Sequence, residues 1–399
     1  MLIERNTYLD DLLSFKDKKL IKVITGIRRA GKSTLFQLYI EKLNKQGVSK
    51  ANIILVNMEH PNFRKIKTAD DLYDYIESRL SISGRNYVFI DEIQQVNDFQ
   101  QAADWLYARD DVDLYITGSN AYLLSGELAT LLSGRYVEIR MQPLSFKEYV
   151  SIFPNGQDKD RLFSSYLENS SFPGVLELNR KQDRNAYLEG IYNTILVKDI
   201  MDRSRIANPS MLKSVIEFMF DNIGNLVSSN KIANTMQSAG RKISVPTVEN
   251  YLTALENSFV LYRAGRYDIK GKQRLATGYK YYVADIGLRY FLLGSSKNDL
   301  GHILENIVYL ELIRRRYEVY VGKNDETEVD FVAIDENGMK EYYQVSLTVL
   351  DENTLKRELR PLQQIGDHYK KILLTMDKLP ISSYDGIVQV NVIDWLIKV

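Results

Sequence analysis

The sequence predicts an α/β protein that begins with a parallel sheet between two layers of helices and ends with a second α/β region. Three observations support this prediction. Short β-branched runs alternate with helical periodicity over residues 1–142, a glycine-bounded loop joins the first run to a helix, and strands alternate with helices again from residue 279 onward. Consecutive parallel strands need crossover helices, so the first pattern favours a layered αβα sandwich.

The stretch from Leu20 to Thr34 joins the first strand, a loop and the start of a helix. It reads LIKVITGIRRAGKST, and the spacing G-x-x-x-x-G-K-S begins at Gly26. Glycines let backbone N–H groups approach phosphate oxygens closely, and the helix that follows adds the positive end of its dipole. The pattern predicts a P-loop that binds a nucleoside triphosphate.

The residue types in this loop fit that chemistry. Lys32 can reach the β- and γ-phosphates, and the hydroxyl of Ser33 can bind Mg²⁺. A chance match to the pattern is the alternative, which the flanking strand and helix disfavour. We expect the nucleotide to be held by Gly26, Ile27, Arg28, Arg29, Ala30, Gly31, Lys32, Ser33 and Thr34.

Two further strands are expected at residues 53–57 (IILVN) and 87–90 (YVFI), separated by a helical pattern around Leu72. The second of these runs ends in Asp91 and Glu92, which is the pattern of a Walker B strand. Asp91 would then hold Mg²⁺, and Glu92 would activate the attacking water as a general base. A strand that simply stops at two exposed acids is the alternative, and the upstream P-loop disfavours it.

A fourth strand, residues 114–117, is followed by Gly118, Ser119 and Asn120. Ligands bind at the carboxyl edge of a parallel sheet. Ser119 and Asn120, with Thr117 behind them, are therefore candidates to sense the γ-phosphate or to position the water. The same side chains could instead cap the next helix, and the two roles are compatible.

A short apolar helix is expected over Leu123–Leu132 and a fifth strand over residues 136–139. Arg135 lies between them, outside the nucleotide motifs. It could project toward the γ-phosphate of a neighbouring subunit. It could equally be a surface or helix-capping arginine, and the sequence leaves both interpretations open.

Residues 143–228 are mostly helical in pattern and are predicted to form a lid or linker region. The basic residues Lys198, Arg203 and Arg205 near its end are more typical of a solvated face than of phosphate ligands. A break in the helical pattern occurs at residues 171–174, which read SFPG.

Residues 229–278 are predicted to form a winged-helix-like module, because two short helical patterns precede a strand. The outer face of its second helix carries Glu249 and Glu256 and no basic residue, so packing or protein docking is expected before DNA contact. The polar, basic segment Gly265–Gly278 is expected to be a linker or an exposed loop.

Residues 279–399 form the second predicted α/β region. Glu305 lies on an expected helix, Asp330 on a strand and residues 344–346 on the next strand. This layout resembles that of PD-(D/E)xK nucleases, which use carboxylates to hold Mg²⁺ and a lysine to assist the nucleophile. Here the third position reads Gln-Val-Ser instead of acid-x-lysine. We therefore expect only a weak metal site at Glu305 and Asp330, in an inactive, restriction-endonuclease-like domain.

Composition excludes several classes of function. Lys plus Arg and Asp plus Glu both number 52 in the 399 residues, so no overall basic surface for nucleic acid exists. There is no cysteine, which excludes disulfides, thiolate catalysis and cysteine zinc sites, and three histidines are too few for a histidine metal cluster. No apolar run reaches the roughly 18 residues of a membrane span, and the N-terminus lacks the apolar core of a signal peptide. A cytoplasmic protein is expected.

With these motifs in view, the chain resembles a prokaryotic family of AAA-type ATPases that carry a C-terminal region of unknown function with a degenerate nuclease-like fold. The resemblance covers nearly the whole chain and implies ATP binding and hydrolysis, a winged-helix element in the middle and a restriction-endonuclease-like end. It rests on GIRRAGKS at 26–33, IDE at 90–92, TGSN at 117–120, GR at 134–135, FPG at 172–174, Glu305 and EVDF at 328–331.

The sequence as a whole predicts a Mg²⁺-dependent ATPase whose nucleotide state switches its C-terminal domains. One alternative is a nucleotide-dependent DNA-binding regulator in which hydrolysis is incidental. Another is a DNA-cleaving effector. DNA, an unidentified protein and further copies of the same chain are the partners considered, and no membrane partner is expected.

Overall fold

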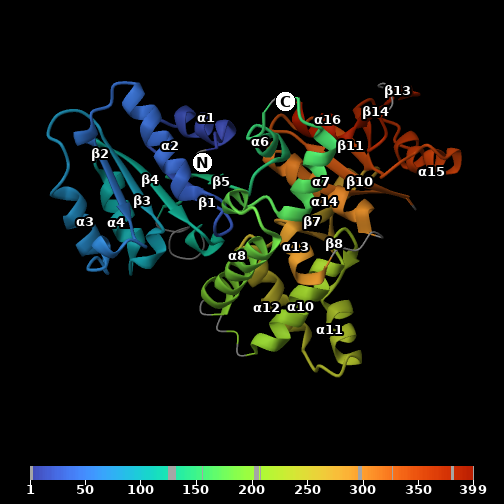
Figure 1. Ribbon diagram of the computed structural model, residues 1–399, viewed down its shortest axis with the longest axis horizontal. Helices are drawn as coiled ribbons and strands as arrows, with labels where there is room; N and C mark the ends of the chain where they lie inside the picture. The colour runs from blue at the N-terminus through green and yellow to red at the C-terminus, as the bar shows by residue number, and fades with distance from the viewer. Residues whose placement is uncertain are drawn as a thin grey trace. The chain divides into compact units, whose positions relative to one another are not determined.

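The computed structural model describes residues 3–124, 132–154, 156–201, 206, 208–294, 299–325, 327–378 and 382–398. Its helices and strands are drawn in Figure 1. The chain divides into two compact units. Unit 1 comprises Met1–Pro143 with Asn257–Phe259, and unit 2 comprises Leu144–Glu256 with Val260–Val399.

The described part of unit 1 contains a five-stranded sheet in the order β2-β3-β4-β1-β5, and every neighbouring pair is parallel. All five predicted strands are confirmed. Strands β1, β3 and β4 are buried along their whole length, as expected for parallel strands covered on both faces. The bounds are Ile21–Thr25 (β1), Ile53–Asn57 (β2), Asn86–Asp91 (β3), Val112–Gly118 (β4) and Tyr136–Arg140 (β5).

Helices cover both faces of this sheet, which confirms the αβα sandwich (Figure 1). Phe89 points into the core shared with α1 and α2, whereas its neighbours Val88 and Ile90 point into the core shared with α3 and α4. This alternation is the two-residue period of a strand. The predicted helix at Leu123–Leu132 falls largely outside the described residues. The helices are α1 (Asn6–Ser14), α2 (Lys32–Lys45), α3 (Ala69–Glu77) and α4 (Phe99–Ala108), with 3₁₀ turns at Lys50–Asn52, Pro61–Phe63, Ile93–Gln95 and Ala121–Leu124.

Unit 2 begins with a run of helices, as its sequence pattern predicts, and ends with an α/β region. No helix in the described ranges is long and apolar enough to cross a membrane. The helices are α6 (Phe146–Val150), α7 (Lys159–Asn169), α8 (Lys181–Thr194), α10 (Pro209–Asp221), α11 (Ser229–Ser238), α12 (Val245–Asn257), α13 (Ile286–Leu293), α14 (Leu300–Arg314), α15 (Glu352–Gln363) and α16 (Val392–Ile397), with a 3₁₀ turn at Pro173–Glu177 and a π-helical stretch at Ile195–Met201.

The described strands of unit 2 join in one nine-stranded mixed sheet, in the order β13-β14-β12-β11-β10-β9-β7-β8-β6. The strands β9 to β12 lie where the sequence pattern placed them. The bounds are Leu226–Val227 (β6), Leu261–Asp268 (β7), Gln273–Val283 (β8), Glu318–Asn324 (β9), Thr327–Ile334 (β10), Lys340–Val345 (β11), Lys370–Thr375 (β12), Ser382–Tyr384 (β13) and Ile387–Asn391 (β14).

The expectation of a linker or exposed loop at Gly265–Gly278 is wrong. Most of this segment belongs to the antiparallel hairpin of β7 and β8, and β7 also pairs in parallel with β9. The glycines and basic residues concealed the strand pattern in the sequence, while pairing with β9 buries Tyr267 in the sheet. The boundary expected between residues 278 and 279 therefore falls inside β8.

A buried carboxylate, Asp285, ties together two segments of unit 2 that are far apart in sequence. Its Oδ2 accepts hydrogen bonds from the backbone N–H (2.7 Å) and the hydroxyl (2.6 Å) of Ser171. Its Oδ1 accepts from the N–H of Leu288 (2.6 Å) and caps α13. Burial raises the pKa of Asp285 above its ordinary value, although these hydrogen bonds favour the charged form. At the adjacent Gly287, a Cβ would lie 2.3 Å from Ser170 Cα, so the two segments pack without room for a side chain.

Replacing Asp285 by alanine leaves three buried donors without their acceptor. We expect the free energy of unfolding of unit 2 to fall by about 3 kcal/mol. Denaturant unfolding monitored by Trp395 fluorescence measures this in a Trp105→Phe background, because the chain has only 2 tryptophans. Asp351→Ala is the matched control, since it removes an exposed helix cap of the same type and costs about 1 kcal/mol. Equal losses in the two variants would contradict the prediction.

Candidate functional site

The loop between β1 and α2 follows the carboxyl end of β1, and its backbone needs glycine at two positions. Gly26 has φ 142° and Gly31 has φ 102°, values that side chains rarely adopt. A Cβ on Gly26 would lie 2.0 Å from the carbonyl oxygen of Met141, so no other residue fits there. Arg29, inside the loop, also has a left-handed φ of 67°. The loop is therefore strained and closely packed against the end of β5.

Arg5 fastens this loop to the segment that follows β5. Its guanidinium donates to the carbonyl oxygens of Ala30 (3.1 Å) and Gln142 (2.7 Å), and the hydroxyl of Tyr8 accepts from the N–H of Gln142 (3.1 Å). Arg5 is only 3% exposed, so these are buried, charge-assisted bonds. The sequence patterns did not mark Arg5 or Tyr8, because no motif links the N-terminal helix to the loop.

The first residues of α2 meet the carboxylates at the end of β3. Lys32 Nζ donates to the carbonyl oxygens of Gly26 (3.0 Å) and Ile27 (3.3 Å) and lies 3.8 Å from Glu92 Oε1. The hydroxyl of Ser33 hydrogen-bonds to Asp91. The structure thus brings together the two groups of residues that the sequence placed about 60 positions apart.

Thr117 of β4 connects the two carboxylate residues. Its hydroxyl donates to Asp91 Oδ1 (2.6 Å) and accepts from the backbone N–H of Glu92 (2.9 Å). Burial raises the pKa of Asp91 above its ordinary value, while hydrogen bonds from Ser33 and Thr117 and the charge of Lys32 act in the opposite direction. Asp91 is 2% exposed, so its orientation is fixed by these bonds.

Glu92 has a left-handed backbone, with φ 54°, which costs a residue other than glycine about 1–3 kcal/mol. Its Oε2 accepts from the Ser119 hydroxyl (3.0 Å) and from Gln94 Nε2 (2.5 Å). Burial alone raises the pKa of Glu92, but the charges of Lys32 and Arg28 and these hydrogen bonds bring it below its ordinary value. The carboxylate is therefore ionised at neutral pH and held in one orientation.

The remaining predicted loop and strand-end residues surround this centre. Arg28 pairs with Glu59 (2.9 Å), and Thr34 lies half-buried in the first turn of α2. Asn120 is buried after β4, where its carbonyl accepts from the N–H of Leu123 (3.1 Å). Gln94 was not predicted, since it lies two residues past the Walker B pattern and belongs to no motif.

Arg135 lies at the opposite edge of the sheet from the loop. Its carbonyl accepts from the N–H of Ile21 (2.8 Å), at the amino end of β1, whereas the loop follows the carboxyl end. Five strand residues at about 3.3 Å each separate the two edges by about 16 Å. The guanidinium pairs with Asp104 and lies over the ring of Tyr107. The structure does not bring Arg135 to its own chain's site, and a role in a neighbouring subunit stays a prediction.

Glu305 and Asp330 lie together in unit 2, beside a recess of about 330 Å³ that His302, Gln344 and Glu358 also line. Glu305 accepts hydrogen bonds from Lys280 Nζ (3.0 Å) and from the Tyr282 hydroxyl (2.6 Å). Across the described part of the chain, no set of three or more histidine, aspartate or glutamate side chains is arranged to hold a metal ion.

Lys280 compensates the charge of these acids. It pairs with Glu305 (3.0 Å) and with Glu328 (2.8 Å). Burial and the negative charge of Glu305 raise the pKa of Asp330 well above its ordinary value. Asp330 Oδ2 also accepts from the N–H of Val345 (2.8 Å). The two acids predicted as weak metal ligands are thus engaged by a lysine and a backbone amide.

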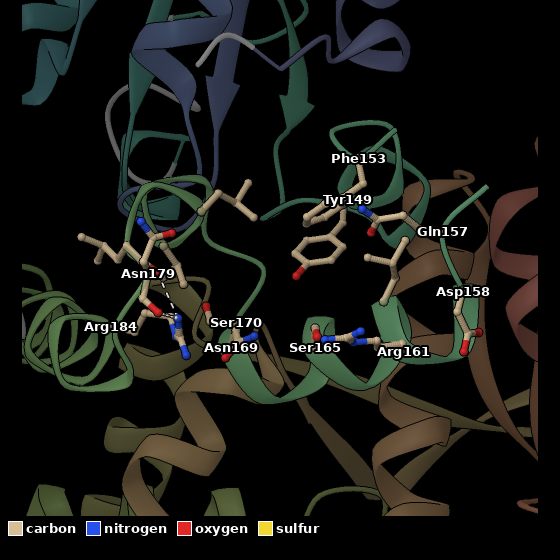
Figure 2. Close-up of a pocket in the computed structure, with 14 residues that line it drawn as sticks. Tyr149, Phe153, Gln157, Asp158, Arg161, Ser165, Asn169, Ser170, Asn179 and Arg184 are labelled. Carbon is tan, nitrogen blue, oxygen red and sulfur yellow. Dashed lines mark hydrogen bonds between the residues drawn. The ribbon is translucent and has the colours of Figure 1, made fainter. Parts of the chain in front are cut away.

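Unit 2 has another pocket, of about 570 Å³, which none of the predicted catalytic residues lines (Figure 2). Figure 2 shows Tyr149 and Phe153 on one side and Arg161 on the other. Arg184 also lines it and donates to the carbonyls of Leu178 (3.0 Å) and its neighbour Asn179 (2.9 Å). The pocket adjoins the SFPG break of the sequence.

Comparison with known proteins agrees with this architecture. Residues 18–150 match the family model described as AAA domain, and residues 160–299 match a domain of unknown function (DUF8612). A Walker-type ATPase of Pyrococcus abyssi has the same fold, with a TM-score of 0.51 and 16% identity over 73% of this chain and 95% of that one. The chain thus combines an AAA domain over residues 18–150 with a domain of unknown function over residues 160–299.

Two relatives show the family. An uncharacterized protein of Haemophilus influenzae is 42% identical over 100% of this chain and 99% of its own length. An uncharacterized protein of Methanocaldococcus jannaschii is 31% identical over 86% of this chain and 78% of its own length. The chain belongs to the same family as these two proteins.

Thr117→Val keeps the side-chain shape but removes the hydroxyl that serves both carboxylate residues. Asp91 then loses one hydrogen bond and keeps the one from Ser33, while the Glu92 N–H loses its acceptor. We expect unit 1 to lose about 2 kcal/mol of unfolding free energy. Trp105 fluorescence during urea unfolding, in a Trp395→Phe background, measures this. Ser78→Ala, which removes an exposed hydroxyl from the same unit, should change it by less than about 0.5 kcal/mol. A Thr117→Val loss no larger than that control would show that the bridge does not stabilise the site.

Proposed function

We propose that this protein is a Mg²⁺-dependent ATPase whose nucleotide state switches its C-terminal domains. One observation carries the proposal. The loop lysine and serine at the start of α2 meet the two carboxylates at the end of β3, with Lys32 Nζ 3.8 Å from Glu92 Oε1. The match to the AAA domain supports nucleotide binding by this part of the chain.

In this proposal residues 26–34 bind the triphosphate. The loop glycines permit close approach to the phosphates, and the N-terminus of α2 adds favourable electrostatic potential. Lys32 neutralises the terminal phosphates. Its ammonium exchanges its hydrogen bonds to two loop carbonyls for bonds to phosphate oxygens.

The oxygens of Asp91 and Ser33 fit Mg²⁺, since carboxylate and hydroxyl oxygens are the donors that this hard ion prefers. When bound, the ion neutralises charge on the phosphate oxygens. The hydrogen bond between Ser33 and Asp91 keeps these two side chains together. Thr117 holds the Asp91 carboxylate from behind.

Glu92 orients the attacking water and accepts its proton. Its lowered pKa keeps the carboxylate ionised, and Ser119 and Gln94 fix its direction. We assign Ser119 to positioning this base, and Asn120, at the same strand end, to sensing the terminal phosphate.

For the chain as a whole we propose four parts: an ATPase core over residues 1–142, a helical lid over 143–228, a winged-helix-like module from residue 229 to the end of β8 at Val283, and a nuclease-like, inactive domain from residue 284 onward. The order α11, α12, β7, β8 supports the third part, and the preceding strand β6 joins it by pairing antiparallel to β8. The order α14, β9, β10, β11, α15, β12 supports the fourth.

A protein partner fits the winged-helix-like module better than DNA. The exposed positions of α12 carry Glu249, Asn250 and Thr253, which bring no positive charge to a phosphate backbone. Glu256 on the same helix pairs with Arg263 and so neutralises a nearby positive charge. In this proposal the switch acts through the chain crossing between Pro143 and Leu144, which directly follows Met141 and Gln142 beside the loop.

Two substitutions separate binding from turnover. Lys32→Ala should weaken ATP binding roughly 10- to 100-fold, because it removes a charge-assisted contact to phosphate. Glu92→Gln should retain ATP binding and lower kcat by about 10²- to 10⁴-fold, because it removes the general base. Calorimetric titration with ATP and phosphate-release kinetics measure the two effects. Lys45→Ala, which removes an exposed lysine from the other end of α2, is the control and should match wild type. Full turnover in Glu92→Gln would refute the assignment of the base.

The C-terminal domain should not cut DNA, because Lys280 is paired with its acids and no lysine follows Gln344 in the strand. Supercoiled plasmid incubated with the protein, ATP and either Mg²⁺ or Mn²⁺ should stay intact on an agarose gel. Nicking that disappears in Asp330→Asn would instead assign nuclease activity to this recess.

A further inference from the structure

The side-chain amide of Gln142 is buried without a partner. Gln142 is 2% exposed, and within the described residues neither its Nε2 nor its Oε1 has a hydrogen-bond partner. A buried amide left in this state costs roughly 1–3 kcal/mol for each unsatisfied group, so native proteins rarely retain one without use. Both a donor and an acceptor are available at one position.

This amide belongs to the surroundings of the phosphate loop. The backbone carbonyl of Gln142 and that of Ala30, inside the loop, accept from the same Arg5 guanidinium, at 2.7 and 3.1 Å. The preceding residue, Met141, is the one whose carbonyl excludes a side chain at Gly26. Gln142 therefore follows the strand next to β1, at the sheet edge where the loop also lies.

We propose that Gln142 reads the base of the bound nucleotide and selects adenine. This inference rests on the proposed nucleotide binding and names the specificity of that same site. A glutamine amide can accept from the exocyclic N6 amino group of adenine and donate to its N7, and this bidentate pair is specific for adenine. Bound adenine satisfies both orphaned atoms of Gln142 at once.

Other bases do not complete this pair. Guanine and hypoxanthine present acceptors at both O6 and N7, so the Gln142 carbonyl would face another acceptor. The analogue 7-deaza-ATP keeps the amino group but lacks the N7 acceptor. Discrimination by one good bidentate pair corresponds to roughly 5- to 150-fold in affinity.

The test is a set of competition titrations against a ribose-labelled fluorescent nucleotide, using ATP, GTP, ITP and 7-deaza-ATP. Wild-type protein should bind ATP roughly 5- to 150-fold more tightly than GTP or ITP, with 7-deaza-ATP between them. In Gln142→Met the four should bind with similar affinity, and the affinity for GTP should stay within about twofold of wild type, because the triphosphate contacts are intact. Gln389→Met, at a buried glutamine of unit 2 whose amide is hydrogen-bonded, is the control and should keep the wild-type preference.

Gln142→Glu gives a second test that keeps the shape of the side chain. It retains an acceptor for N6 but places a second acceptor oxygen opposite the N7 acceptor, so ATP should lose its advantage over 7-deaza-ATP. The thermal midpoint of Gln142→Met should equal or exceed that of wild type, since the substitution removes an unpaired amide.

The outcomes separate this inference from the proposed function. Wild-type protein that binds all four nucleotides equally, or variants that keep the wild-type preference, overturn the role of Gln142 and leave ATP binding in place. Wild-type protein that binds none of the four overturns the nucleotide site itself, and this inference with it.

Discussion

The site at the edge of the unit 1 sheet depends on one hydroxyl group, that of Thr117. It connects the Asp91 carboxylate with the backbone N–H of Glu92, and both residues are almost fully buried. Glu92 adopts a left-handed backbone that is unfavourable for its side chain, and such strain persists only where neighbouring bonds fix the conformation. With that backbone fixed, the carboxylate is within reach of Ser119 and close to Lys32. A threonine of β4, bonded to the end of β3, therefore determines where the acidic pair meets the loop.

The loop itself is held by contacts that lie outside its motif. Gly26 fits against the Met141 carbonyl, and Arg5 joins Ala30 to the segment after β5. These contacts make the N-terminal helix and the last strand parts of the site's support. The loop is consequently packed against Met141 and joined through Arg5 to Gln142, just before this segment of unit 1 ends at Pro143.

Local sequence patterns predicted much of this arrangement and did not predict the rest. The five strands of unit 1 and the grouping of Lys32 with Asp91 and Glu92 follow from apolar runs and from glycine, lysine and acid positions, because these signals lie within a few residues of each other. Arg5 and Gln142 could not be identified in this way, since their roles depend on contacts with residues far away in the chain.

The same limit explains the error at Gly265–Gly278. Its polar residues look like a loop locally, but Gly265–Asp268 pairs with β9, and the segment from Gln273 onward pairs with β7.

The two acidic sites of the chain contain similar residues and differ in how a lysine meets them. In unit 2, Lys280 lies within 3.0 Å of both Glu305 and Glu328, so its charge is fully used in fixed ion pairs. In unit 1, Lys32 lies 3.8 Å from Glu92, and its short bonds go to two loop carbonyls. Exchanging carbonyl bonds for phosphate bonds costs little, because an ammonium gains a stronger partner in the exchange. Separating a buried ion pair leaves an unpaired charge and costs several kcal/mol. The two sites thus differ in the partners of their lysines: Lys32 can exchange its carbonyl bonds at little cost, whereas Lys280 is held in two ion pairs.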